Sequence, residues 1–474
     1  MGEPPRVEST PIHIFRLPVE VLQYISEQAT LYLFDDHPFE PSRSLDKSRL
    51  TLSSVCSWWR AIVVNHPVLW ASILYANSGP PTPLEWIWLC LRRSAPHDLH
   101  LAIHFCVDYH DLQLRYIIYP SVWEDGPAIS RLISFLDTIE DDMDRVCRLS
   151  ICTFDPDNLH KLIIPKIRLA NLTNLRGLLL TTGGNPCRAI GAMALSRLDQ
   201  LELCVPTIHR TSLASLLARC HSLRHLSLQI FSKKCSLGGS ASPALHVPHL
   251  QSLNLRGCVM PAHAFHAPEL KRLLISPSMT WWEADGPIAE ITDHHEEVVD
   301  FGHFPQLHQL VVGTWYRDME YLEPSIRLIQ AHPDIGGLTL HGQGAGDLLR
   351  SAFQPFPHSH TAIYPSMNEG GAAPENGTEW ELQVPTALRS LVVNSLLGFK
   401  DATLAKALRH MLLDSDILHV KFLLRFFEDR NSTWVEYNTD DYADYISLLT
   451  EFPGRFSIGT LPLVGSLDSL VECR

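Results

Sequence analysis

The sequence predicts a mixed α/β protein in which a small, all-helical N-terminal module is followed by an irregular solenoid of stacked repeats. Two observations carry this prediction: apolar residues keep helical spacing up to about residue 75, and a strand pattern built on leucine recurs afterwards. With 474 residues the chain is longer than one compact core, which favours several domains or a repeat array. Hydrophobic residues make up 45% and charged residues 19%, so the bulk of the chain is expected to fold.

The first helical stretch follows a polar tail that contains adjacent prolines. Pro18 suits the first turn of a helix, where its missing N–H would have no partner in any case. Val21, Leu22 and Ile25 then follow at helical intervals. Residues 35–47 contain two prolines and many charges, and they predict an exposed loop after this helix.

The second helical stretch carries one apolar stripe. Its members, at steps of three or one, are Leu52, Val55, Cys56, Trp59, Ile62 and Val63. After a turn at residues 65–67, Leu69, Trp70 and Ile73 repeat the helical spacing. A module of about 60 residues has difficulty burying so many large side chains alone, so it is expected to bind a partner.

Three linked elements of this module resemble an F-box. They are L-P-x-E at residues 17–20, V-C-x-W-W-R at residues 55–60 and H-P-x-L-W at residues 66–70, with Ile25 at a further matching position. In that family the F-box is a small helical module that docks onto the Skp adaptor of a cullin–RING ubiquitin ligase. The resemblance implies adaptor binding by Leu17, Pro18, Ile25, Leu52, Val55, Cys56, Trp59, Leu69 and Trp70. The loop at residues 35–47 is a departure from the motif, and a plain helical cap on a larger fold is the alternative.

The pattern L-x-x-L-x-L, or a close variant, occurs nine times after the helical module. Its central leucines are Leu149, Leu178, Leu201, Leu226, Leu253, Leu273, Leu310, Leu338 and Leu391. The first five intervals range from 20 to 29 residues, and the later ones imply insertions or degenerate units. This region resembles a divergent leucine-rich-repeat array, and F-box and leucine-rich repeats are a known family combination. An irregular α/β domain with leucine-rich strands is the alternative.

Two further regularities accompany the repeats. A proline precedes four of the strand patterns, at Pro248, Pro268, Pro305 and Pro333, and it is expected to mark the start of a strand. The segment at residues 212–220, SLASLLARC, is expected to be the return helix of one repeat.

In such an array, the first, fourth and sixth positions of the pattern point into the solenoid, and the third and fifth point to the other face of a short parallel strand. This concave face, with its mixed polar groups, suits recognition of a protein surface. The candidate target-binding residues are Gln200, Glu202, His225, Ser227, Gln229, Asn254, Arg256, Arg272, Thr339 and His341. For any single one of them, an ordinary solvent-facing strand residue is the alternative.

The sequence divides into four predicted regions. They are a disordered tail at 1–11, an F-box-like helical module at 12–76, a divergent repeat solenoid at 77–425 and a C-terminal cap at 426–474. Two insertions interrupt the solenoid, at residues 279–303 and 351–381. The repeat boundaries after residue 276 and the role of the last region are not fixed by the sequence.

Composition and motifs exclude several classes of function. The net charge of −14 argues against binding of the nucleic-acid backbone, and no segment has the length and apolarity of a membrane span. The 11 cysteines show no C-x-x-C spacing, so neither a disulfide framework nor a zinc knuckle is expected. No nucleophile elbow, P-loop or H-E-x-x-H motif occurs. The histidines and glutamates of residues 294–297 are expected to form a solvated acidic loop, and a metal site is the alternative. We therefore expect no enzyme activity, cofactor or metal.

These expectations combine into one function. The resemblance implies a substrate-recognition subunit of a Skp–cullin–F-box type ubiquitin ligase in the cytoplasm, the nucleus or both. The helical module would bind the adaptor, and the repeats would bind a target protein that the sequence does not identify. A repeat scaffold without a ligase is the first alternative, and an enzyme hidden in the later repeats is the second.

Overall fold

The structure is a computed structural model of the whole chain. It describes residues 18–35, 43–76, 83–105, 126–153, 163–169, 172–183, 186–190, 193, 195–205, 208–230, 245–256, 265–276, 304–314, 322–342, 345–353, 387–395, 402–415, 417–424 and 443–460. These residues belong to two compact units, the first made mainly of Met1–Leu178 and the second of Leu179–Gly465. Leu17 and the insertion at 279–303 lie outside the described residues.

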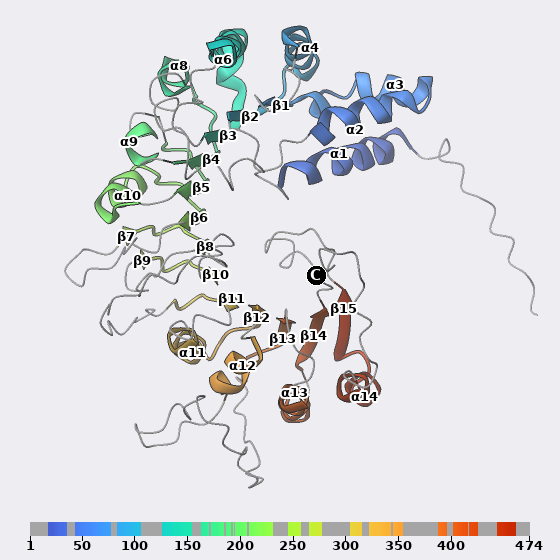
Figure 1. Ribbon diagram of the computed structural model, residues 1–474, viewed down its shortest axis with the longest axis vertical. Coiled ribbons are helices and arrows are strands. Elements are labelled where there is room, and N and C mark those ends of the chain that lie inside the picture. Colours follow the sequence, from blue (N-terminus) through green and yellow to red (C-terminus); the bar gives the residue numbers. More distant parts are fainter. Residues whose placement is uncertain are drawn as a thin grey trace, which may run out of the picture. The chain divides into compact units, whose positions relative to one another are not determined.

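The first unit contains the N-terminal helices and the first parallel strands (Figure 1). Its elements are α1 (Val19–Asp35), α2 (Arg43–Ser54), α3 (Ser57–Val64), the 3₁₀ helix η2 (Pro67–Trp70), β1 (Ser72–Ala76), α4 (Leu84–Ser94), β2 (Leu99–Phe105), α6 (Gly126–Ile139), the 3₁₀ helix η4 (Glu140–Arg145), β3 (Val146–Thr153) and α8 (Ile164–Leu169). Strand β4 (Gly177–Thr182) begins in this unit and ends in the next. Strands β1, β2 and β3 pair in parallel, in chain order.

The second unit alternates strands with helices that lie along one side of them (Figure 1). Its elements are α9 (Pro186–Ile190), β5 (Gln200–Val205), α10 (Arg210–Leu217), β6 (His225–Ile230), β7 (Leu245–His246), β8 (Ser252–Arg256), β9 (Phe265–His266), β10 (Arg272–Ser276), β11 (Gln309–Thr314), α11 (Leu322–Ala331), β12 (Gly337–Gly342), α12 (Ala345–Phe353), β13 (Ser390–Ser395), α13 (Ala402–Asp414), β14 (His419–Leu424), α14 (Ala443–Glu451) and β15 (Phe456–Thr460). The longer strands from β5 to β15 pair in parallel and in chain order, and β7 pairs with β9 separately. The predicted α/β class with a parallel sheet is therefore confirmed.

All nine predicted strand patterns are strands: β3, β4, β5, β6, β8, β10, β11, β12 and β13. The predicted return helix at residues 212–220 is also present, as α10. The pattern missed β1, β2, β14 and β15, because other apolar residues replace some of the repeated leucines in these segments. Ile73, for example, was assigned to a helix, but it lies in β1 directly after η2. The parallel pairing thus extends beyond both ends of the leucine pattern.

The central leucines lie opposite one another in successive strands. In the second unit the register joins Leu201, Leu226, Leu253, Leu273, Leu310, Leu338 and Leu391 into one column, which Val420 and Phe456 continue. In the first unit Ile73, Leu101 and Leu149 are aligned in the same way. All of these side chains are buried. Because neighbouring strands are about 4.8 Å apart, each side chain of a column contacts the next one.

The predicted alternation of inward and outward positions holds in β6. Leu223, Leu226 and Leu228 are buried, whereas His225 is exposed and Ser227 is half-buried. Strand β10 departs from it, because Leu274 at the fifth position is buried and the sixth position is only half-buried. The outward face of β10 is therefore apolar at Leu274, although it is still polar at Arg272.

The prolines before the strands occupy a tight turn rather than the strand itself. The N–H of Leu250 donates to the carbonyl of Val247 at 3.1 Å, which places Pro248 at the second position of a β-turn. Pro268, Pro305 and Pro333 occupy the same position of equivalent turns. A φ of about −65° suits this position, and no N–H is needed there. The strand thus begins four residues after the proline. The prediction that the proline marks the first residue of the strand is therefore wrong by four residues.

Three predicted boundaries also differ from the structure. The apolar stripe from Leu52 to Val63 is broken at Val55 and Cys56, where α2 ends and α3 begins. The Sγ atom of Cys56 accepts a hydrogen bond from the N–H of Trp59 at 3.4 Å and so caps α3. The loop predicted at residues 35–47 is shorter, because α2 already begins at Arg43. The insertion predicted from residue 351 overlaps the last turn of α12.

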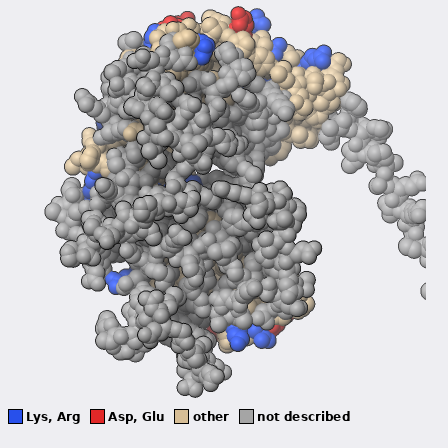
Figure 2. Space-filling view, in the orientation of Figure 1, with Lys and Arg blue, Asp and Glu red and all other residues tan. Residues whose placement is uncertain are grey.

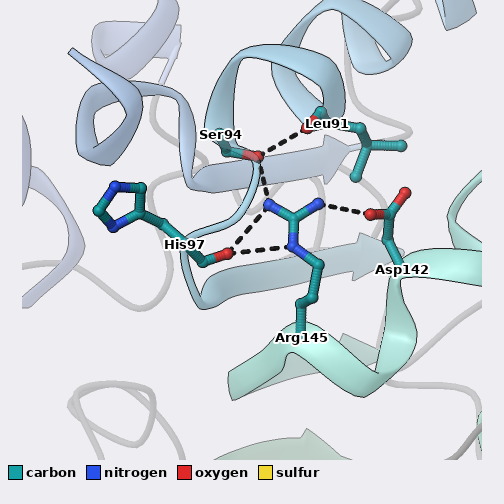
Figure 3. A network of polar contacts seen from close by, with 5 residues as sticks. All are labelled: Leu91, Ser94, His97, Asp142 and Arg145. Atoms are coloured by element: carbon teal, nitrogen blue, oxygen red, sulfur yellow. Dashed lines mark hydrogen bonds and ion pairs between the residues drawn. The ribbon is translucent and has the colours of Figure 1, made fainter.

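Arg145, the last residue of η4, ties α4 to the segment before β3 (Figure 3). Its Nη2 atom donates to Oγ of Ser94 at 2.9 Å, and its Nε and Nη2 atoms donate to the carbonyl of His97 at 3.1 and 2.9 Å. Nη1 pairs with Asp142, and Ser94 in turn donates to the carbonyl of Leu91 at 3.0 Å. One guanidinium therefore closes the end of α4 and fixes it to the next repeat.

We expect Arg145→Met to lower the free energy of unfolding by about 2 kcal/mol, because several acceptors lose a charged donor. Arg131→Met is the matched control, since Arg131 is exposed on α6, and it should change stability by less than about 0.5 kcal/mol. Urea denaturation followed by circular dichroism measures both. Equal midpoints for the two variants would show that the network contributes nothing.

The leucine column makes a second prediction. Leu226→Ala removes a side chain that is 2% exposed, and the lost contacts and the cavity should cost about 3 kcal/mol. Ser227→Ala changes the next residue of the same strand on the opposite face and should cost less than about 0.5 kcal/mol. Thermal and urea unfolding of both variants provide the comparison. A Leu226→Ala protein as stable as Ser227→Ala would contradict the assigned register.

Candidate protein-interaction surfaces

The N-terminal helices share a small apolar core. Leu22 of α1 and both Trp59 and Ile62 of α3 are buried together, with Leu52 and Trp58 packed against them. The arrangement follows from the spacing of these residues, because each helix turns its apolar stripe toward the other two. These contacts fix the three helices relative to one another.

Large apolar side chains of the same helices remain exposed. They are Val19, Val21, Tyr24, Ile25, Leu50 and Val55, with exposed fractions between 40% and 61%. Pro18, directly before α1, and Val21 and Ile25 within it recur at intervals of three and four residues and so share one side of the helix. Single exposed apolar residues are ordinary, but this number on one short module is typical of a protein-binding surface. We call these six residues the module apolar surface.

The predicted adaptor-binding residues fall into four groups. Leu17 lies outside the described residues, Pro18, Ile25 and Val55 are exposed, Leu52 and Cys56 are half-buried, and Trp59, Leu69 and Trp70 are buried. The last three expose almost no surface to a partner. The prediction that they contact the adaptor is therefore corrected, because they belong to the interior of the first unit. The physical reason is that so small a module needs its largest side chains for its own core. The spacing also missed Tyr24 and Leu50, which are apolar residues off the buried stripe.

Trp70 and Arg49 join the helices to the first strand and to α4. Trp70 donates from Nε1 to the carbonyl of Val63 at 2.8 Å, and its ring meets Trp86 edge-on at 5.6 Å. The Nη2 atom of Arg49 donates to the carbonyl of Ser72 at 2.5 Å, although Arg49 is only 2% exposed. The helical module is therefore anchored to β1 through buried polar and aromatic contacts.

The candidate target-binding residues are brought together in three adjacent rows. Strand register aligns Gln200, His225 and Arg272 in one row, Glu202, Ser227 and Asn254 in the second, and Gln229 and Arg256 in the third. His225 is exposed and the other seven are half-buried. The face of β5, β6, β8 and β10 therefore presents mixed polar side chains to solvent.

The two remaining candidates are not accessible. Thr339 and His341 of β12 are 5% and 2% exposed, so their predicted exposure is wrong. The neighbouring outward positions of Thr339 are Leu274 and Val311, which are apolar and buried as well. The outward face thus changes from polar and accessible to apolar and enclosed between β8 and β12.

Among the described residues, no group of three His, Cys, Asp or Glu side chains is placed to hold a metal ion. Burial lowers the pKa of His104 to about 4, so its ring is neutral at pH 7. Within the same part of the chain, no helix has both the length and the apolarity to cross a bilayer.

The described cysteines are free thiols, and most of them are buried. Burial raises the pKa of both Cys187 and Cys220 to about 11, which suppresses the thiolate form. We expect both thiols to resist Ellman's reagent at pH 8, where about 0.1% of each would be thiolate, and to react when urea unfolds the protein. Mass spectrometry after labelling identifies the modified cysteines. Rapid labelling of Cys220 in the folded protein would refute its burial.

Charges of both signs lie close together over the described surface near α4 and α6, at the top of Figure 2. This mixture differs from the one-signed patch that a phosphate backbone requires.

Burial lowers the pKa of His225, and Arg272 and Arg224 lower it further against the opposing effect of Asp199. These four residues therefore share one electrostatic environment at the start of β6.

One family model matches part of the chain. Its description is "FBD-associated F-box protein At5g56370, LRR repeats", and the match covers residues 143–331. This span begins just before β3 and ends with α11, so it contains seven of the nine predicted strand patterns. The match supports the leucine-rich-repeat prediction and links these repeats to an F-box protein family. The search of curated proteins found no match.

Two solved structures are similar to larger parts of the chain. One is a protein from Bacteroides fragilis, with 14% identity, 64% of this chain and 71% of that chain covered, and a TM-score of 0.30. The other comes from the Rad7 and Elc1 complex of yeast, with 9% identity, 88% of this chain and 91% of that chain covered, and a TM-score of 0.37.

Proposed function

We propose that this chain is the substrate-recognition subunit of a Skp–cullin–F-box type ubiquitin ligase in the cytoplasm, the nucleus or both. The observation that supports this proposal most directly is the module apolar surface. It belongs to a helical module that resembles an F-box and that precedes a leucine-rich-repeat array. The match of residues 143–331 to the repeats of an F-box protein family supports the same assignment.

The adaptor would cover the module apolar surface. Each large apolar side chain contributes about 1.5–3 kcal/mol when it passes from full exposure to burial, so six half-exposed ones can supply much of a binding energy. Pro18, Ile25 and Val55 are the exposed members of the F-box pattern, and Tyr24 and Leu50 extend the surface beyond it. Trp59 and Trp70 would act indirectly, because they hold the helices in place.

The repeat array would bind the target on the polar rows of β5, β6, β8 and β10. A stack of parallel strands is stiff, since each repeat is packed against both neighbours. The chain itself would form and break no bonds. It would bring the target to the ligase, and proximity of this kind can lower a barrier by about 7–11 kcal/mol.

The proposal predicts that the full chain captures a purified Skp adaptor and that Val55→Asp weakens this capture at least tenfold. Burial of a carboxylate against an apolar partner is strongly unfavourable, which is the reason for the expected loss. Leu413→Asp is the matched control, because Leu413 on α13 has the same exposed fraction of 57%. Affinity is measured by biolayer interferometry, with circular dichroism to verify folding.

Two outcomes would reject the proposal. The first is a folded wild-type chain with no measurable affinity for the Skp adaptor, which would leave a repeat scaffold as the better interpretation. The second is equal binding by the Val55→Asp and Leu413→Asp proteins, which would remove the module apolar surface from the interface.

A further inference from the structure

A column of residues runs along the edge of the second unit where its strands begin. From β6 to β13 it contains Arg224, Gln251, Lys271, His308, Gly336 and Arg389. Each N–H donates to the carbonyl of the preceding member, for example Lys271 to Gln251 at 2.9 Å and Arg389 to Gly336 at 2.9 Å. The backbone hydrogen bonds therefore define one continuous row, which we call the edge column.

The edge column is basic although the chain is acidic. It contains three cations, one histidine and no carboxylate, whereas the whole chain has 52 acidic and 38 basic residues. The side chains of Arg224, Lys271 and Arg389 are exposed. Among the described residues, no carboxylate forms an ion pair with any of these three. Asp199, the residue before β5, occupies the next position of the row, and the basic stretch ends there.

The spacing of the cations suits an extended chain. Arg224 and Lys271 are two strands apart, about 10 Å, and Lys271 and Arg389 are three strands apart, about 14 Å. An extended peptide rises about 3.4 Å per residue, so acidic residues three or four positions apart would meet successive cations. Arg272 and His225 lie one residue further along two of the strands and add to the same edge.

We propose that the edge column binds an extended, anionic segment of the target protein that lies across the strands. The inference rests on the proposed function, since it names the kind of target segment that the repeats receive. Carboxylate or phosphate oxygens would accept hydrogen bonds from the two guanidinium groups and the ammonium group. A segment of about eight residues is long enough to span Arg224 to Arg389.

The test measures binding of three fluorescein-labelled peptides of twelve residues to the full chain by fluorescence anisotropy at low salt. One peptide has Glu at every third position between Gly and Ser, the second has phosphoserine there, and the third has Gln. We expect the Glu peptide, the phosphoserine peptide or both to bind at least tenfold more tightly than the Gln peptide. The two anionic peptides distinguish a carboxylate ligand from a phosphate ligand.

A triple variant, Arg224→Glu, Lys271→Glu and Arg389→Glu, should weaken anionic peptide binding at least tenfold. The matched control changes three exposed cations outside the column, Arg92→Glu, Arg131→Glu and Lys406→Glu, and therefore alters the net charge equally. It should bind the peptides within twofold of wild type. The triple variant should still capture the Skp adaptor, so failure of this inference is distinguishable from failure of the proposed function.

Three results would overturn the inference. One is equal binding of the Gln peptide and the anionic peptides, and another is equal loss in the triple variant and the matched control. The third is tighter binding of a single-stranded DNA twelve-mer than of either anionic peptide, which would indicate a general polyanion surface.

Discussion

Burial of the leucine columns between successive strands is the constraint on which the structure depends. One repeat has a single apolar face, and water would reach that face unless the next repeat covered it. Burial contributes about 1.5–3 kcal/mol for each leucine, and it is gained only when Leu226, for example, lies opposite Leu253. A shift of one residue would turn every leucine to the other face, so the columns also fix which polar residues point outward. The polar rows and the edge column are thus consequences of the same register.

The sequence predicts the repeats well where this constraint acts through leucine itself. Nine strand patterns were found because the residues of a column must recur in register. In the first unit the column includes Ile73 in β1, and in the second unit it continues through Val420 in β14 and Phe456 in β15, where other apolar side chains fill the position. A pattern defined by leucine could not find these strands, although isoleucine, valine and phenylalanine also gain free energy when they are buried. The leucine pattern also could not predict that Thr339 is buried, because the accessibility of the outward face depends on residues distant in the sequence.

The helical module shows why motif residues and contact residues differ. The spacing from Leu52 to Val63 suggests one continuous helix, but the chain turns at Cys56, whose Sγ atom caps α3. This break turns Val55 away from the stripe and leaves it 57% exposed, while Trp59 is buried. A resemblance identifies the motif as a whole, and only the packing separates the side chains that build the module from those that a partner can reach. The separation moves the candidate adaptor contacts toward Pro18, Ile25 and Val55.

The two candidate surfaces differ in the physics of binding. The module apolar surface gains free energy when water is removed from it, and this gain is not screened by salt. The edge column attracts its ligand by charge, and interactions between exposed charges weaken once the Debye length falls to about 8 Å at physiological ionic strength. The affinity for the adaptor would therefore depend little on the salt concentration, whereas the affinity for the target would fall as the salt concentration rises. A recognition subunit benefits from this difference, because it can keep its ligase while it exchanges one target for the next.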